Sequence, residues 1–221
     1  IGTTATKALV ITSDGEVAAA AERPVDLRSP FPGWAEEDIA QWWENVCSLT
    51  RTLPAVDVAA VAVSGMAPCV IVLDADGSPL RPSIQQNDAR AAAEVEELAE
   101  GLGAAGVLER TGSAITQQSV GPTALWLARH EPDIWRATRT IMGSYDYVSF
   151  LLCGSRSLER NWALESGLYD FRQGAWTEDV CAAAGIDPSL LPPVRQAGDF
   201  LGEVTPEAAK VTGLLTGTPV I

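Results

Sequence analysis

The segment Ile1-Gly2-Thr3-Thr4-Ala5-Thr6-Lys7 opens the chain and leads into an apolar run from Ala8 to Ile11. Together they predict a tight polar turn followed by a buried strand. Gly2 allows the backbone to turn and to approach a ligand closely. The threonine hydroxyls, the N–H groups of the turn and the charge of Lys7 would suit a phosphate group. An ordinary hairpin turn is the alternative interpretation of these residues.

The composition describes an ordered globular protein. The 221 residues, 47% of them hydrophobic, supply enough material for the core of one large domain or two small ones. A net charge of -14 argues against nucleic acid or an anionic membrane as a partner. The 4 cysteines are widely spaced and no signal peptide is visible, which predicts reduced thiols in a cytoplasmic protein. A single histidine, His130, argues against a histidine zinc site or a Ser-His-Asp hydrolase.

Both ends of the sequence predict a fragment of a longer protein. No initiator methionine is present, and the first residue should already lie in a strand or turn. The last residues, Gly217 to Ile221, form an apolar run just after a turn, as if a strand were cut short.

The order of the elements predicts a ribonuclease-H-like (actin-like ATPase) α/β domain. We expect a mixed five-stranded sheet flanked by helices, with helical insertions. The strands are expected at 5–11, 17–23, from Val25 onward, at 58–63 (buried and parallel) and at 69–73. Glu36-Glu37-Asp38 is predicted to occupy the first turn of a helix, followed by apolar residues at helical spacing: Ile39, Trp42, Trp43, Val46 and Leu49.

Two polar stretches follow predicted strands, where ligands bind in open α/β sheets. They are Ser64-Gly65-Met66-Ala67-Pro68 and Gln85-Gln86-Asn87-Asp88. Beyond them the chain is mainly helical. Helices are expected near 88–102, 119–130, 131–137, 145–152, 176–184 and 206–211.

These motifs, in this order, resemble the FGGY carbohydrate kinases, and within them the xylulokinase-like branch. The likeness covers essentially the whole chain but only the N-terminal domain of that family. It is carried by Ile1 to Lys7, Gly33-Trp34-Ala35-Glu36-Glu37-Asp38 with Trp42-Trp43, Ser64-Gly65-Met66, Leu73-Asp74 to Pro82, Asp88-Ala89-Arg90, Gln118 to Trp126 with Glu131-Pro132, Asp146-Tyr147, and Thr212-Gly213-Leu214 to Val220.

The resemblance implies transfer of a phosphoryl group from ATP, with Mg²⁺, to a sugar hydroxyl in a cleft between two actin-like domains. Such chemistry needs positioning, charge neutralisation and a carboxylate to take the hydroxyl proton. Residues 1–221 would be the N-terminal sugar-binding domain, and the nucleotide domain would be absent from this chain. The general-base aspartate is expected beyond Ile221, and an aspartate that helps to hold Mg²⁺ before Ile1. The resemblance also allows a homodimer.

Site residues follow from the resemblance position by position. Gly2, Thr3, Thr4 and Lys7 would face the ATP phosphates. Met66, Ala67 and Pro68 would contact the sugar, although Gln-Met-His is usual there. Asp88 and Arg90 match a W-x-D-x-R pattern in which Gln86 replaces tryptophan, and Gln118 matches a substrate-contacting position. The opening turn and the Asp88 edge are expected on opposite walls of one cleft.

A purely structural role is the alternative interpretation for several of these residues. Asp88 would also serve as the N-cap of the next helix, and Arg90 as the partner of a nearby acid. Gln118 would also serve as a loop residue. Trp162 is more consistent with the core than with stacking on a sugar.

At the level of function, a pentulose such as D-xylulose is the predicted acceptor. Gluconate, ribulose and a polyol such as erythritol are alternatives, because the Met66-Ala67-Pro68 loop departs from the usual pattern. A non-catalytic sugar-binding regulatory module of the same fold is the alternative from another class. The polypeptide 1–221 alone is expected to be inactive, which an ADP-release assay would test.

Overall fold

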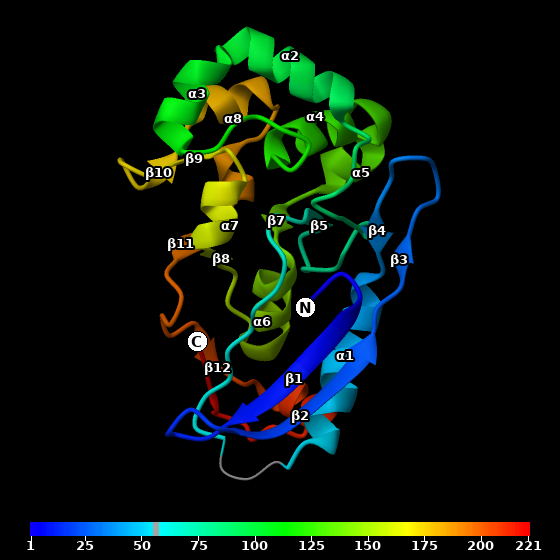
Figure 1. The fold of residues 1–221 in the computed structure, drawn as a ribbon, viewed down its shortest axis with the longest axis vertical. Helices are drawn as coiled ribbons and strands as arrows, with labels where there is room; N and C mark the ends of the chain where they lie inside the picture. Colours follow the sequence, from blue (N-terminus) through cyan, green and yellow to red (C-terminus); the bar gives the residue numbers. More distant parts are fainter. Residues whose placement is uncertain (55–57) are drawn as a thin grey trace.

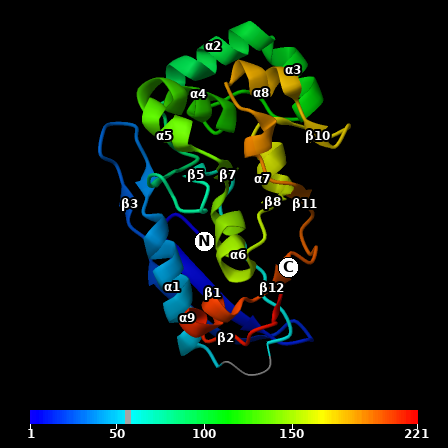
Figure 2. The same cartoon turned by 180° about the vertical axis from the view of Figure 1, so that it is seen from behind.

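The computed structural model describes residues 1–54 and 58–221 of the chain. One end of the molecule is a hairpin covered by helices. Strands β1 (Ala5–Ile11) and β2 (Val17–Pro24) pair antiparallel. Helix α1 (Ile39–Thr52) packs on them, and α9 (Pro206–Thr212) lies beside α1 (Figures 1 and 2). Asp38 caps α1 by accepting a hydrogen bond from the Ala40 N–H at 3.0 Å.

The centre of the molecule is a short buried ladder. Strand β5 (Ile71–Leu73) pairs antiparallel with β7 (Thr140–Met142), and every residue of both is buried. Helix α6 (Ser144–Cys153) begins directly after β7 and ends at Gly154, whose φ of +75° is the left-handed conformation that glycine adopts without strain. The buried ladder thus fixes where α6 begins.

The opposite end is helical (Figure 1). It contains α2 (Ala92–Leu102), α3 (Ala104–Thr111), α4 (Val120–His130), α5 (Pro132–Ala137) and α8 (Glu178–Ala183). The remaining elements are short: β3 (Leu27–Arg28), β4 (Glu36–Glu37), β6 (Ser83–Ile84), β8 (Leu158–Glu159), α7 (Arg160–Glu165), β9 (Tyr169–Asp170), β10 (Ala175–Trp176), a 3-10 turn (Pro188–Leu190), β11 (Val194–Arg195), β12 (Gly202–Glu203) and β13 (Pro219–Val220).

The strands do not form the predicted single five-stranded sheet. In the described residues they form separate ladders of 2 or 3 strands. The main reason is the run 58–63, for which the prediction of a buried parallel strand is wrong. It makes a single parallel bridge, between Val61 and Val220, and Ala59, Ala60 and Ala62 are exposed. The β1–β2 hairpin and the β12–β13 ladder are separate sheets.

The prediction that Glu36 and Glu37 begin a helix is also wrong. They form β4, which pairs with β3 and with β6, and both are buried. Their carboxylates have partners that a helical first turn would not provide: Arg81 and Arg90 for Glu36, and the Trp42 indole N–H at 2.8 Å for Glu37. The helix therefore begins after these acids rather than with them.

All 4 cysteines are free thiols: Cys47, Cys69, Cys153 and Cys181. Over residues 1–54 and 58–221, the helices are too short or too polar to cross a bilayer.

Candidate functional site

A cavity of about 660 Å³ is lined by the loop 62–67, helix α6, the segment 157–165 and the loop 195–201, together with Gln86, Gln118 and Ile221. These parts are far apart in the sequence. The side chains around it are mainly amides, hydroxyls and charged groups. Its polar lining residues are Ser64, Gln86, Gln118, Tyr145, Asp146, Ser149, Ser157, Glu159, Asn161, Glu165, Arg195 and Gln196.

The loop beginning at Ser64 is held close to α6. A Cβ atom on Gly65 would lie 2.7 Å from the Ser144 Oγ and 2.9 Å from the Ile1 carbonyl oxygen, so only glycine fits there. The Ser144 hydroxyl donates a hydrogen bond to the Met66 carbonyl at 3.1 Å, and the Met66 N–H donates to the Ile1 carbonyl at 3.1 Å. The opening residues and α6 therefore fix this wall of the cavity.

Asp146 of α6 fixes the opposite wall by holding the start of α7. Its Oδ1 accepts a hydrogen bond from the Glu159 N–H at 2.7 Å. Glu159 in turn caps α7, because its Oε2 accepts from the Asn161 N–H at 2.8 Å. Asn161 and Glu165 are four residues apart on α7, so they lie on one face of it, and both line the cavity.

The cavity is acidic. Among the lining residues that the structure describes, the carboxyl groups belong to Asp146, Glu159 and Glu165, and the one basic side chain belongs to Arg195. Burial raises the pKa of Asp146 to about 7, and the neighbouring charge of Glu159 adds to the rise. Burial also raises the pKa of Tyr145. Amides and hydroxyls beside these acids give a surface that can donate to and accept from several sugar hydroxyls.

The structure places the predicted sugar residues in different environments. Ala67 and Gln118 line the cavity. Met66 lies behind the lining, with its Sδ 3.8 Å from the Nε2 of Gln86, which does line it. Pro68 is buried outside the lining.

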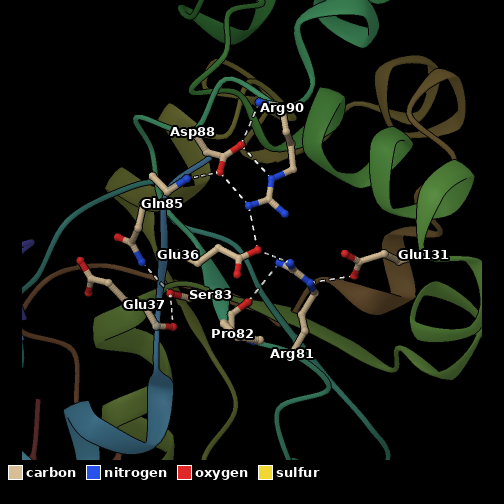
Figure 3. Close-up of polar contacts among 10 residues, drawn as sticks. Glu36, Glu37, Arg81, Pro82, Ser83, Gln85, Asp88, Arg90 and Glu131 are labelled. Atoms are coloured by element: carbon tan, nitrogen blue, oxygen red, sulfur yellow. Dashed lines mark hydrogen bonds and ion pairs between the residues drawn. The ribbon is translucent and has the colours of Figure 1, made fainter. Parts of the chain in front are cut away.

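Asp88 and Arg90 are not among the lining residues; they lie in a buried network of ion pairs (Figure 3). Arg90 pairs with Asp88 and with Glu36, both at 2.8 Å, as one alternative had proposed. The other alternative, Asp88 as a helix N-cap, is wrong, because α2 begins at Ala92 with Ala91 in the cap position. A direct role of Asp88 and Arg90 in sugar binding stays a prediction.

The predicted phosphate residues also lie outside the cavity lining. The Gly2 N–H donates to the Ala5 carbonyl at 3.1 Å, which forms the expected turn. Thr3 and Thr4 belong to that turn, and the Lys7 Nζ lies 3.6 Å from Glu22 in an exposed ion pair. This turn and Asp88 therefore do not line this cavity, and their place on opposite walls of one cleft stays a prediction. The Ser64 loop, which is hydrogen-bonded to Ile1, and Gln86, two residues before Asp88, do line the cavity.

Several cavity residues had no predicted role. No role was predicted for Asn161 and Glu165 because no helix was predicted at α7. Their i, i+4 spacing is nevertheless typical of two residues on one face of a helix. Ser157, Arg195 and Gln196 lie on connecting segments and carry no local pattern. Trp162 is core, as expected: it is fully buried and its indole N–H donates to the Cys69 carbonyl at 2.9 Å.

Among the residues that the structure describes, no group of three or more His, Cys, Asp or Glu side chains is arranged to hold a metal ion. Mg²⁺ in phosphoryl transfer is commonly held by one or two carboxylates together with phosphate oxygens.

Known proteins of similar sequence include xylulose kinases and autoinducer-2 kinases. The xylulose kinase of Streptomyces rubiginosus is 35% identical over 206 residues, which are 91% of this chain and 42% of that protein. The autoinducer-2 kinase of Yersinia enterocolitica is 32% identical over 230 residues, 100% of this chain and 43% of that protein. The chain thus spans less than half the length of these relatives.

Solved structures agree with this. The crystal structure of a xylulose kinase from Rhodospirillum rubrum matches with a TM-score of 0.95 and 46% identity, over 99% of this chain and 47% of that one. This confirms the predicted ribonuclease-H-like, actin-like α/β class. A model of the N-terminal domain of the FGGY carbohydrate kinases matches residues 1–221. The chain therefore belongs to the FGGY family of carbohydrate kinases.

Proposed function

We propose that the full-length protein transfers a phosphoryl group from ATP to a hydroxyl of a small neutral sugar, with a pentulose such as D-xylulose as the first candidate. The observation that carries the proposal is the cavity of about 660 Å³ lined by Gln86, Gln118 and Asn161. Amide side chains donate and accept hydrogen bonds at once, which suits a molecule with several hydroxyls. The similarity to xylulose kinases supports the choice of pentulose.

We also propose that residues 1–221 form the sugar-binding domain of a two-domain enzyme. Relatives more than twice as long support this. ATP would arrive as its magnesium complex, with its phosphates toward the turn of Gly2, Thr3 and Thr4. A second domain would supply the nucleotide site, and an aspartate beyond Ile221 would take the proton from the sugar hydroxyl.

The charge of the cavity favours a neutral acceptor over a sugar acid. Three carboxyl groups against one guanidinium leave the lining with an acidic balance. A carboxylate such as that of gluconate would be repelled there, whereas xylulose, ribulose or erythritol would not. Ala67, in the position where the resemblance expects methionine, also leaves room for a longer neutral acceptor.

A substrate panel tests the proposal. We expect the full-length protein to phosphorylate D-xylulose with a kcat/KM at least tenfold above that for D-gluconate, measured by coupled ADP release with MgATP. Replacing Gln118 with alanine should raise the KM for the sugar about three- to tenfold, because one or two hydrogen bonds are lost, and should leave the KM for ATP unchanged. Activity on none of the neutral sugars would refute the proposed function.

A further inference from the structure

We propose that Asp88, Arg90 and Glu36 are positioning residues: their buried charge cluster holds Gln86 in the wall of the cavity, and they do not contact the sugar. This inference rests on the proposed function, since Gln86 is taken to bind the sugar. It assigns Asp88 and Arg90 a role that differs from the direct contact expected from the family resemblance.

The cluster is almost fully buried (Figure 3), and among the described residues Arg90 Nη1 is a buried donor without a hydrogen-bond partner. Asp88 Oδ1 accepts hydrogen bonds from the Arg90 N–H at 2.9 Å and from Nε at 2.8 Å, while Oδ2 accepts from Nη2 at 2.8 Å. Nη2 also donates to Glu36 Oε1 at 2.8 Å. Side-chain exposure is 1% for Arg90, 2% for Asp88 and 11% for Glu36. At such burial, removing one partner leaves an uncompensated charge, so the cluster resists rearrangement.

The cluster ties down the backbone on both sides of Gln86. The Gln85 N–H donates to the Ala35 carbonyl at 3.0 Å, and the Ala35 N–H donates back to Asp88 Oδ2. Beyond Asp88, the Ala89 N–H donates to the Gly33 carbonyl at 2.8 Å. Residues 85 and 89 are thereby fixed to the segment 33–35, and the residue between them cannot shift without breaking these bonds.

A second anchor joins the cluster to the helical end of the molecule. Arg81 contacts Glu36 Oε1 through Nη2 and Glu131 Oε2 through Nε, the latter at 2.8 Å. The Arg90 guanidinium also lies 3.7 Å from the ring centre of Trp34, where cation–π attraction holds it. These contacts therefore connect the segment 81–90 to strand β4 on one side and to the start of α5 on the other.

Direct sugar binding by Asp88 and Arg90 would require this arrangement to open. Neither lines the cavity, whereas Gln86, between the anchored residues, does. Both oxygens of Asp88 are already occupied by donors. The route from the cluster to the sugar therefore runs through Gln86.

A double-mutant cycle in the full-length enzyme tests this. We expect Gln86→Ala and Asp88→Asn each to raise the KM for the sugar about tenfold, the loss of roughly one well-placed hydrogen bond. The KM for ATP should not change, and kcat should stay within about twofold. The double variant should show the same tenfold rise, because Asp88 acts through Gln86. A KM for the sugar that rises about a hundredfold in the double variant would overturn the proposal, as would an unchanged KM in Asp88→Asn.

Two further variants complete the test, one as a substitute for Asp88→Asn and one as a control. If Asp88→Asn does not fold, Glu36→Gln takes its place in the cycle, because glutamine keeps the shape and one acceptor oxygen for Arg90. Glu94→Gln is the matched control: Glu94 is also a buried acid, 4% exposed and paired with an arginine, Arg129, but it lies on α2 away from Gln86. Its KM should equal that of the wild type.

Hydrogen exchange supplies a readout that needs no catalysis. Without sugar or ATP, Asp88→Asn should exchange the Ala35, Ala89 and Arg90 amides at least tenfold faster than wild type, and Glu94→Gln should not. Unchanged exchange at these amides would overturn the positioning role. A full-length protein that phosphorylates no sugar would instead refute the proposed function, with the exchange result still deciding whether the cluster holds residues 85–90.

Discussion

Replacement of Trp162 by alanine is expected to lower the free energy of unfolding by about 3–5 kcal/mol, the usual range for a buried tryptophan. Trp162 is fully buried. Its indole N–H donates to the Cys69 carbonyl at 2.9 Å, so the change also leaves that carbonyl without its donor. Because a domain is typically stable by only about 5–15 kcal/mol, this one substitution would remove a large share of the stability.

The position of Trp162 explains why the effect should reach the cavity. Trp162 lies on α7 next to Asn161, and its contact with Cys69 connects α7 to the segment leading into β5. A Cβ atom on Gly143 would lie only 2.4 Å from Trp162 Cδ1, so the ring packs directly against the start of α6. The indole is therefore the core group that holds α6 and α7 together below the cavity.

Urea denaturation followed by circular dichroism measures this effect. Trp162→Phe should recover more than half of the loss, because most of the volume is restored and only the hydrogen bond is missing. Trp176→Ala is the control, since Trp176 is only partly buried, on β10, and should cost less. A loss of less than about 1 kcal/mol for Trp162→Ala would contradict the assignment.

The parts of the fold that could be predicted from the sequence are those set by local rules. The β1–β2 hairpin follows from two apolar runs around Asp14-Gly15, and α1 follows from Ile39, Trp42 and Leu49 at helical spacing. Helices α4 and α6 were found for the same reason, with ends marked by Pro132 and Gly154.

The failures share a different cause: the deciding partners are far away in the sequence. Glu36 and Glu37 follow the usual pattern of acids at a helix start. In the structure Glu36 instead lies in a strand, where it pairs with Arg81 and Arg90, about 50 residues later in the sequence. The run 58–63 has the composition of a buried strand, yet only Val61 finds a partner, Val220. Composition cannot reveal whether a neighbouring strand is present.

The same limit applies to the site. Ala67 and Gln118 could be located through motif order. Asp146 belongs to a motif, Asp146-Tyr147, but its link to Glu159 and so to Asn161 depends on how α6 and α7 meet. Arg195 reaches the cavity from a loop with no pattern at all. Residues that contribute through tertiary placement alone are those the sequence did not indicate.

Two buried carboxyl groups should make the protein less stable as the pH rises from about 4 to about 7. Burial raises the pKa of Asp146 from 3.8 to about 7 and that of Glu37 from 4.5 to about 7. In the unfolded chain both groups ionise near pH 4, so the folded state binds more protons between these values. Each group then lowers the free energy of unfolding by up to about 1.4 kcal/mol per pH unit, and the effect is complete above about pH 7.

Asp146→Asn should remove the contribution of that carboxyl, since an amide does not titrate and its oxygen can still accept the Glu159 N–H. Relative to the wild type, the variant should gain about 2–3 kcal/mol in free energy of unfolding between pH 5 and pH 8, measured by urea denaturation at each pH. Glu37→Gln should behave alike, because the Trp42 indole keeps its acceptor. Asp133→Asn, at a side chain that is 91% exposed, controls for net charge. Its free energy of unfolding should change with pH as that of the wild type does. If the free energy of unfolding of the Asp146 variant has the same pH dependence as that of the wild type, the carboxyl is already ionised at pH 5. The acidic wall of the cavity then carries its full charge throughout this range.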